Sequence, residues 1–278
     1  QTFDVAASSV RTGDQLNVAF TVNGATPPRT PMSLTLVVDT SCSMAADDRM
    51  GLVHRALRQV PAHLVEGDTV SIIAFSDNAT TRVENLSVGM SQWEATFESA
   101  IAGLKPSGGT DLSAGLKRGY AIAKANKRRN NRVMLITDAQ LNRGIVDTDL
   151  VSEVGRRFEQ DDIRLTGVGV GRDFNDSMLN KLTEKGKGAY VFLGSDAVLD
   201  RFFGAGFPSL TQTIAHDVHF ALDLPKGLSM KKFYGEEIST DKQDVQAVHF
   251  SAGTSQVFLQ DLSIQDAISL PNFINRNR

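Results

Sequence analysis

The feature that most constrains the fold is a run of apolar and β-branched residues at positions 34–38, which ends in the pattern Asp39-x-Ser41-x-Ser43. A run of this kind is typical of a central strand of a parallel sheet that is covered on both faces. In such sheets, ligands bind just beyond the carboxyl ends of the strands. One carboxylate and two hydroxyl groups at alternate positions there can point toward one spot. These hard oxygen ligands suit Mg²⁺, Mn²⁺ or Ca²⁺ rather than zinc.

Helical and strand patterns alternate from this first buried strand to residue 213. The alternation indicates βαβ units, and therefore an α/β fold with a Rossmann-like, doubly wound, mostly parallel sheet. Gly204, Gly206 and Pro208 are expected to interrupt the last helix. Strands are expected at about residues 33–38, 70–75, 80–86, 132–137, 163–170 and 189–192, and helices at about 48–65, 93–104, 111–127, 150–160, 175–184 and 196–213.

Strand patterns return on both sides of this α/β segment. Residues 15–22 alternate between apolar and polar side chains, and residues 218–224 do the same before a Pro-Lys-Gly turn. Chain termini usually lie close together, so inserting one domain between two paired ends is geometrically cheap. We therefore expect residues 32–213 to form an α/β domain inserted into a small β-sandwich-like domain, which residues 1–31 and 214–278 build together.

Composition and charge exclude several classes of protein. The chain has 278 residues, enough for one large domain and a smaller one, and its net charge of −3 argues against bulk nucleic-acid binding. No apolar run approaches the roughly 20 residues that a membrane-spanning helix needs. Cys42 is the single cysteine, so an internal disulfide is ruled out. No signal peptide begins at Gln1, which leaves open a cytosolic protein, a mature secreted protein or a trimmed chain.

Two further polar positions follow the same logic as Asp39. Asp138 ends another expected buried strand, and Thr110 lies in a glycine-rich loop that opens a helix. Because the carboxyl ends of parallel strands meet at one sheet edge, these loops can converge on the first one. Any one hydroxyl alone would suit helix capping, but five oxygen-bearing side chains on three such loops favour a metal site. We call Asp39, Ser41, Ser43, Thr110 and Asp138 the metal set.

The metal set, in this order and on these elements, resembles the metal-ion-dependent adhesion site (MIDAS) of the von Willebrand factor A (VWA) domain. The resemblance covers about residues 32–213. It implies that the three hydroxyl groups coordinate a divalent ion directly and that the two carboxylates act partly through water. It also implies an open coordination position, which accepts an Asp or Glu carboxylate from a protein partner. Mg²⁺ tolerates such a site because it keeps several waters and prefers octahedral geometry.

Two positions depart from the family pattern, which usually has glycine at both. Cys42 stands between the two serines, and Ala139 follows the second aspartate. A cysteine at position 42 would be strained if that position required a positive φ. Neither change removes a ligand oxygen, so we expect metal binding to survive. Cys42 is a poor partner for a hard oxygen site and is expected to be a small packed residue.

The function expected from this resemblance is metal-dependent protein binding or adhesion by a bacterial-type VWA module, without enzymatic turnover and outside the cytoplasm. An alternative is an intracellular accessory subunit of an AAA+ ATPase of the chelatase or remodelling type. A third possibility is an enzyme that uses the metal for hydrolysis or phosphoryl transfer. Ser41 and Ser43 have no evident His–Asp partners, so a serine hydrolase is weakly supported. The expected partner is a protein, not a nucleic acid or a membrane.

Overall fold

The computed structural model divides the chain into two compact units, which are described separately. The first, the β unit, contains residues 1–27 and 213–278, and the second, the α/β unit, contains residues 28–212. The structure describes residues 2–126, 130–139, 156–157, 160–171, 179, 183, 189–235, 239, 245 and 248–264. Within them, no helix is long and apolar enough to cross a membrane.

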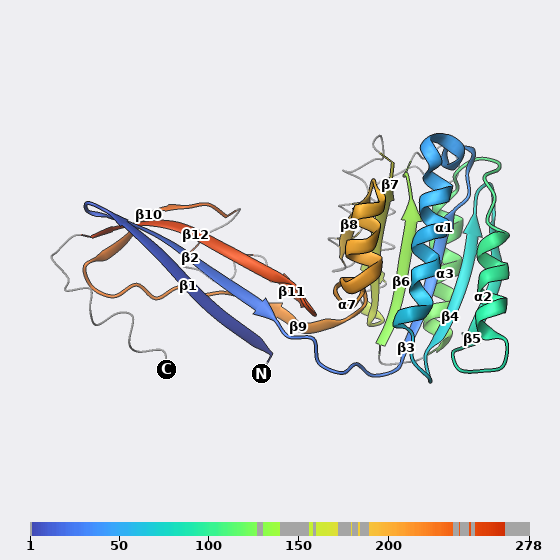
Figure 1. Ribbon diagram of the computed structural model, residues 1–278, viewed down its shortest axis with the longest axis horizontal. Helices are drawn as coiled ribbons and strands as arrows, with labels where there is room; N and C mark the ends of the chain where they lie inside the picture. Colours follow the sequence, from blue (N-terminus) through green and yellow to red (C-terminus); the bar gives the residue numbers. More distant parts are fainter. Residues whose placement is uncertain are drawn as a thin grey trace. The chain divides into compact units, whose positions relative to one another are not determined.

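The β unit joins the two ends of the chain in one antiparallel sheet with strand order β1-β2-β12-β10 (Figure 1). Strand β2 pairs with β12 from Gln15 opposite Ser263 to Asn23 opposite Ser255. Leu16, Val18 and Leu262 form its buried cluster. The strands are β1 (Phe3–Thr12), β2 (Gln15–Gly24), β10 (Leu228–Phe233) and β12 (Ser255–Ile264), and a separate pair consists of β9 (Thr213–Val218) and β11 (Val248–Ser251).

The strand predicted over residues 218–224 is wrong. Strand β9 ends at Val218, and residues 219–225 form neither strand nor helix. Two of its apolar side chains have packing partners: the Phe220 ring lies 4.7 Å from the Phe258 ring and 6.2 Å from the Phe250 ring, between centroids, and Leu224 packs against the buried cluster of the sheet. Leu222 is exposed. The alternation therefore reflects packing of part of the segment, whose backbone joins no strand ladder.

The α/β unit is built on a six-stranded sheet with strand order β5-β4-β3-β6-β7-β8. All neighbouring pairs are parallel except β4–β5, so β5 is the antiparallel edge strand. This confirms the predicted doubly wound, mostly parallel α/β fold. The strands are β3 (Met32–Asp39), β4 (Thr69–Phe75), β5 (Ala79–Ser87), β6 (Asn130–Thr137), β7 (Ile163–Val170) and β8 (Tyr190–Leu193).

Helices cover both faces of this sheet, as Figure 1 shows. Helices α1, α2 and α7 contribute to the buried cluster on one face, and α3 contributes to the cluster on the other. The predicted helices at 150–160 and 175–184 lie largely outside the described residues. The helical segments are η1 (Cys42–Asp48), α1 (Arg49–Gln59), η2 (Val60–His63), α2 (Trp93–Ala102), α3 (Leu112–Asn126), α6 (Asp196–Leu199), η3 (Asp200–Ala205) and α7 (Phe207–Thr211).

Strand β3 shows why its sequence is apolar at consecutive positions. Leu36 and Val38 belong to the α1 cluster, whereas Val37 belongs to the α3 cluster, and all three are fully buried. A strand covered on both faces has no polar side. Helix α3 approaches the sheet closely at Gly119, where an added Cβ would lie 2.6 Å from Val37 Cγ2.

The helix predicted over residues 196–213 consists of three short segments. The backbone leaves helical geometry at Gly204, with φ −87° and ψ −124°, within the stretch where an interruption was predicted. Beyond the break, Phe207 is buried and its ring stacks on His63 with centroids 4.7 Å apart. The break thus lets two aromatic anchors, Phe203 and Phe207, both pack into the core.

Candidate metal centre

The metal set lies where the strand order of the sheet changes direction. From β3 the chain moves to β4 and β5 on one side, and β6, β7 and β8 lie on the other side. Asp39 is the last residue of β3, and Asp138 directly follows β6. The carboxyl ends of two neighbouring strands on either side of such a switch point form the usual ligand crevice of an open α/β sheet.

The loop after β3 brings the first three members of the metal set together. Asp39 is fully buried, and its Oδ1 accepts a hydrogen bond from the backbone N–H of Ser41 at 2.8 Å. The Oγ atoms of Ser41 and Ser43 lie 3.0 Å apart. Ser41 has an extended backbone with φ −65° and ψ 164°, and the chain then enters η1 at Cys42, so Ser43 lies in the first turn of η1 with its hydroxyl beside that of Ser41.

Backbone hydrogen bonds join the glycine-rich loop of Thr110 to this first loop. The N–H of Ser107 donates to the carbonyl of Thr40 at 2.7 Å, and the N–H of Cys42 donates to the carbonyl of Gly108 at 3.1 Å. Thr110, two residues before α3, is fully buried. The loop of Thr110 is therefore held against the loop after β3 by main-chain hydrogen bonds.

Asp77, which the sequence interpretation did not single out, positions the glycine-rich loop. Its Oδ1 accepts a hydrogen bond from the N–H of Gly109 at 2.8 Å. Gly108 has φ +74°, and an added Cβ there would lie 2.6 Å from Asp77 Oδ2. Only glycine satisfies both the left-handed backbone and the close approach of the carboxylate.

Asp138 and Asp39 are linked through Thr137, the last residue of β6. Thr137 Oγ1 donates to Asp39 Oδ2 at 2.5 Å and accepts from the N–H of Ala139 at 2.8 Å. Asp138 is fully buried and accepts a hydrogen bond from Arg49 Nη1 at 2.7 Å. The sequence interpretation missed Thr137 and Arg49. The threonine that precedes the second aspartate was a local signal, whereas nothing near Arg49 in the sequence indicates its partner.

The electrostatics of the site favour the arrival of a positive charge. Burial raises the pKa of the Asp39 carboxyl to about 6 from its ordinary 3.8, and the nearby negative charge of Asp138 adds to the increase. Hydrogen bonds from Thr137 and Ser41 act in the opposite direction. A buried carboxylate with a raised pKa is one whose charged form lacks full compensation. A cation bound beside it would supply that compensation.

The donor geometry fits a small octahedral ion. Metal–oxygen distances of 2.0–2.1 Å place adjacent ligands of an octahedral Mg²⁺ about 2.9 Å apart, whereas Ca²⁺ distances give about 3.3–3.7 Å and a tetrahedral zinc site about 3.3–3.6 Å. The observed 3.0 Å between Ser41 Oγ and Ser43 Oγ matches the first value and equally suits a hydrogen bond between the two hydroxyls. The described residues contain no group of three or more His, Cys, Asp or Glu side chains that could hold a metal ion. Hydroxyl groups would therefore carry much of the coordination.

The two departures from the family pattern differ in their backbone. Cys42 is exposed, and its φ is not among the positive values of the described residues, so no strain arises there. Ala139 has φ +55° and is fully buried. Position 139, and not position 42, therefore has the left-handed backbone that favours glycine. The prediction that Cys42 is a packed residue is wrong, because its side chain faces solvent beside the site.

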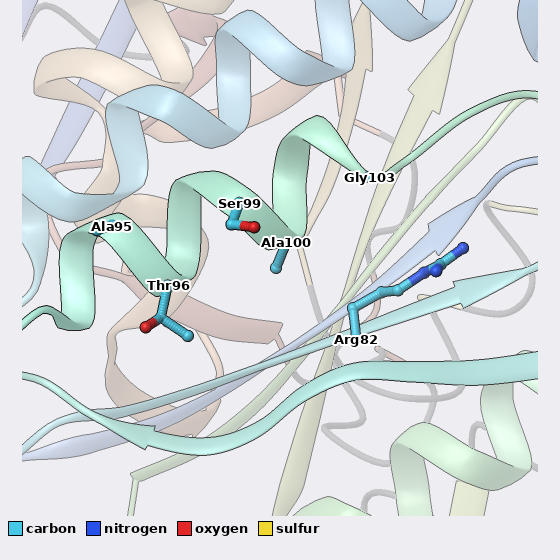
Figure 2. Close-up of a pocket in the computed structure, with 6 residues that line it drawn as sticks. All are labelled: Arg82, Ala95, Thr96, Ser99, Ala100 and Gly103. Atoms are coloured by element: carbon cyan, nitrogen blue, oxygen red, sulfur yellow. The ribbon is translucent and has the colours of Figure 1, made fainter.

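A separate surface hollow of about 470 Å³ lies between edge strand β5 and helix α2. Figure 2 shows Arg82 on β5, with its side chain extending past the end of α2 near Gly103. None of its lining residues belongs to the metal set, so it is not part of the candidate centre. The lining residues are Arg82, Ala95, Thr96, Ser99, Ala100 and Gly103.

The doubly wound sheet and the cluster of oxygen side chains at its switch point define an α/β domain with a candidate ligand site at the carboxyl edge of its sheet. Residues 34–140 match the family model of the von Willebrand factor type A domain. The chain therefore carries a VWA domain, in agreement with the resemblance seen in the sequence.

Relatives and solved structures agree with this assignment. The chain is 24% identical over 223 residues to the uncharacterized protein YfbK of Escherichia coli K12, covering 79% of this chain but only 38% of YfbK. A von Willebrand factor type A structure from Catenulispora acidiphila superposes with a TM-score of 0.64 at 16% identity, covering 95% of this chain and 65% of that one. Proximal thread matrix protein 1 from the mussel byssus, with a zinc-occupied MIDAS motif, gives a TM-score of 0.53 at 17% identity, covering 63% and 46%. The structural matches show the fold.

Proposed function

We propose that this chain is a metal-dependent protein-binding module, in which a divalent cation held by the metal set captures an acidic side chain of a partner. The observation that carries the proposal is the convergence at the switch point of Asp39 with the paired hydroxyls of Ser41 and Ser43, 3.0 Å apart. VWA domains mediate protein interactions, and the mussel protein shows that this fold holds a metal at a MIDAS motif. The zinc belongs to that protein. For this chain we propose Mg²⁺, because hydroxyl ligands suit a hard cation and the 3.0 Å spacing is compatible with octahedral coordination, with Mn²⁺ and Ca²⁺ as the other candidates.

The residues of the site have two roles: some would hold the ion, and others orient the loop that presents the ligands. The hydroxyls of Ser41, Ser43 and Thr110 would be neutral ligands, so they would leave the charge of the ion largely uncompensated. When bound, the ion would supply a Lewis-acidic position for a carboxylate oxygen. Asp39 holds the Ser41 backbone through its Oδ1 and Thr137 through its Oδ2, and so fixes the loop that presents the hydroxyls.

We propose recognition rather than turnover at this site. A hydrolase built on Ser41 or Ser43 would need a histidine base within hydrogen-bond reach. The sequence places two histidines in the α/β unit, and each commits Nε2 to a backbone carbonyl: His54 to that of Leu104 at 3.0 Å and His63 to that of Phe203 at 2.8 Å. An adhesion or assembly role outside the cytoplasm accords best with a binding site of this kind in a chain that also contains a β unit.

The test is a calorimetric titration with Mg²⁺ and Mn²⁺. Wild type is expected to bind one ion, and Ser43→Ala and Asp39→Asn are expected to weaken binding at least about tenfold, because each removes a ligand or its charge. Ser99→Ala, an exposed serine on α2, is the matched control and should bind as wild type does. Equal affinity of all four proteins, or no binding by wild type, would overturn the proposal.

A further inference from the structure

We propose that Arg49 is a built-in positive charge of the metal centre, which weakens metal binding and makes the loaded site more attractive to a carboxylate. The inference rests on the proposed function and concerns a residue that lies outside the metal set. Arg49 is the first residue of α1 and is 4% exposed.

Arg49 contacts two members of the metal set. Its Nη1 donates to Asp138 Oδ2 at 2.7 Å and to the backbone carbonyl of Ser43 at 3.2 Å. Its Nη2 lies 3.9 Å from Asp47 Oδ2, but the Asp47 side chain is 80% exposed, so solvent screens that pair. The buried partner of the guanidinium is therefore Asp138.

The fold makes room for this guanidinium in a specific way. Gly171, directly after β7, has φ +83°, and an added Cβ there would lie 2.4 Å from Arg49 Nε. A side chain at position 171 would force the Arg49 guanidinium to shift. Three separate parts of the chain, the start of α1, the residue after β6 and the residue after β7, thus meet around one cation.

Stability alone is a poor reason for this arrangement. Arg49 Nε is buried and has no hydrogen-bond partner within the part of the chain that the structure describes. A buried donor without a partner is destabilising, and a buried ion pair often stabilises no better than apolar residues of the same size. The guanidinium is more simply explained by its effect on the charge of the site.

That effect follows from counting the buried charges. Among the residues that the structure describes, Asp39 and Asp138 are the buried carboxylates of the metal set and Arg49 is the buried cation that contacts them, so these three groups carry one net negative charge before the ion binds. A divalent ion leaves the site with one net positive charge, which a partner carboxylate neutralises. Without Arg49 the site would hold two negative charges, bind the ion more tightly and be neutral when loaded. Arg49 thus shifts binding energy from the ion to the partner.

The experiment compares Arg49→Met with wild type by calorimetry. Mg²⁺ affinity is expected to rise about tenfold or more, because a repelling charge is removed from a buried site. In saturating Mg²⁺, affinity for a short synthetic peptide with a single Asp is expected to fall. A purely structural role would weaken both. Arg55→Met is the matched control, because Arg55 lies on the same helix, is 42% exposed and pairs with Asp48 and Asp196; both of its affinities should stay at the wild-type values.

Each other outcome has a defined meaning. Wild type that binds Mg²⁺ as tightly as a folded Arg49→Met overturns this inference and leaves the proposed function standing. Binding by Arg49→Met alone supports the inference and overturns the proposed function, and binding by neither protein overturns both. If Arg49→Met does not fold, Arg49→Lys replaces it in the test. Arg49→Lys keeps the positive charge, so its Mg²⁺ affinity should stay within about threefold of the wild-type value. A tenfold rise in its Mg²⁺ affinity would refute the inference.

Discussion

Replacing Asp68 with alanine is expected to destabilise the α/β unit by about 3–5 kcal/mol. The Asp68 side chain is fully buried and accepts four hydrogen bonds that join separate segments. Arg29 donates through Nη1 at 2.8 Å and Nη2 at 2.5 Å, and the backbone N–H groups of Met32 and Val65 donate at 2.7 and 2.8 Å. One carboxylate therefore ties the segment that enters β3 to the turn that leads into β4.

The magnitude follows from what the substitution leaves behind. Without the carboxylate, the Arg29 guanidinium, only 15% exposed, loses its ion pair, and two backbone donors lose their acceptor. Each unsatisfied buried group costs about 1–3 kcal/mol, and breaking a buried ion pair on one side costs about 3–5 kcal/mol. These costs overlap, so the larger single figure is the expected total. Removing Arg29 as well should recover part of the loss, because no guanidinium is then left unpaired.

The assay is urea unfolding followed by fluorescence. Trp93 is the single tryptophan of the chain and begins α2, so its emission reports the α/β unit. Asp161→Ala is the control, because Asp161 pairs with Lys124 at the surface, where such a pair contributes less than about 1 kcal/mol. A loss for Asp68→Ala no greater than that for Asp161→Ala would refute the reasoning.

Three further predictions follow from single positions. Burial acts to raise the pKa of Asp68, but the ion pair and the backbone donors outweigh burial and lower this pKa below 3.8. The stability that the Asp68 carboxylate contributes is therefore present above about pH 4 and is lost as the pH falls below that value. The urea midpoints of wild type and Asp68→Asn should converge below about pH 4. Gly119→Ala should lower the free energy of unfolding by about 1–3 kcal/mol, since its Cβ would lie 2.6 Å from Val37 Cγ2. Gly103→Ala is the control: its Cβ meets no atom closer than 3.5 Å, so the free energy of unfolding should change by less than about 0.5 kcal/mol. Cys42→Gly should change Mg²⁺ affinity by less than about threefold in calorimetry, because the thiol is exposed and supplies no hard oxygen ligand; a larger change would show that the thiol or the cysteine backbone shapes the site.

The sequence predicts the α/β sheet well because its central strands are buried on both faces. Strand β7 begins and ends at the predicted residues, and β4 begins one residue early. Short-range patterns also place Asp39 and Asp138 at strand ends, because each is the first charged residue after an apolar, β-branched run. The interrupted helix after residue 196 is visible in its glycines and proline for the same local reason.

Contacts between distant segments are not predictable in this way. Arg49 lies 89 positions before Asp138 in the sequence. Its spacing from the apolar residues of the helix fits either a solvated or a buried side chain. Asp68 likewise gives no local sign that Arg29 is its partner. The alternation at residues 218–224 misleads because a period of two describes any extended segment whose side chains face a sheet, whether or not its backbone joins the ladder.

Position 139 shows how a sequence departs from a family pattern without losing the fold. The left-handed backbone at Ala139 costs about 1–2 kcal/mol for a residue with a Cβ. Its methyl group is fully buried in the cluster beneath α3, and such a group contributes about 0.8 kcal/mol. Alanine also restricts the unfolded chain relative to glycine, which contributes about 0.4–1 kcal/mol to stability. These gains offset part of the strain, and the fold accommodates alanine at this position. The left-handed turn itself, held by the hydrogen bond from Ala139 N–H to Thr137, is what keeps Asp138 at the site.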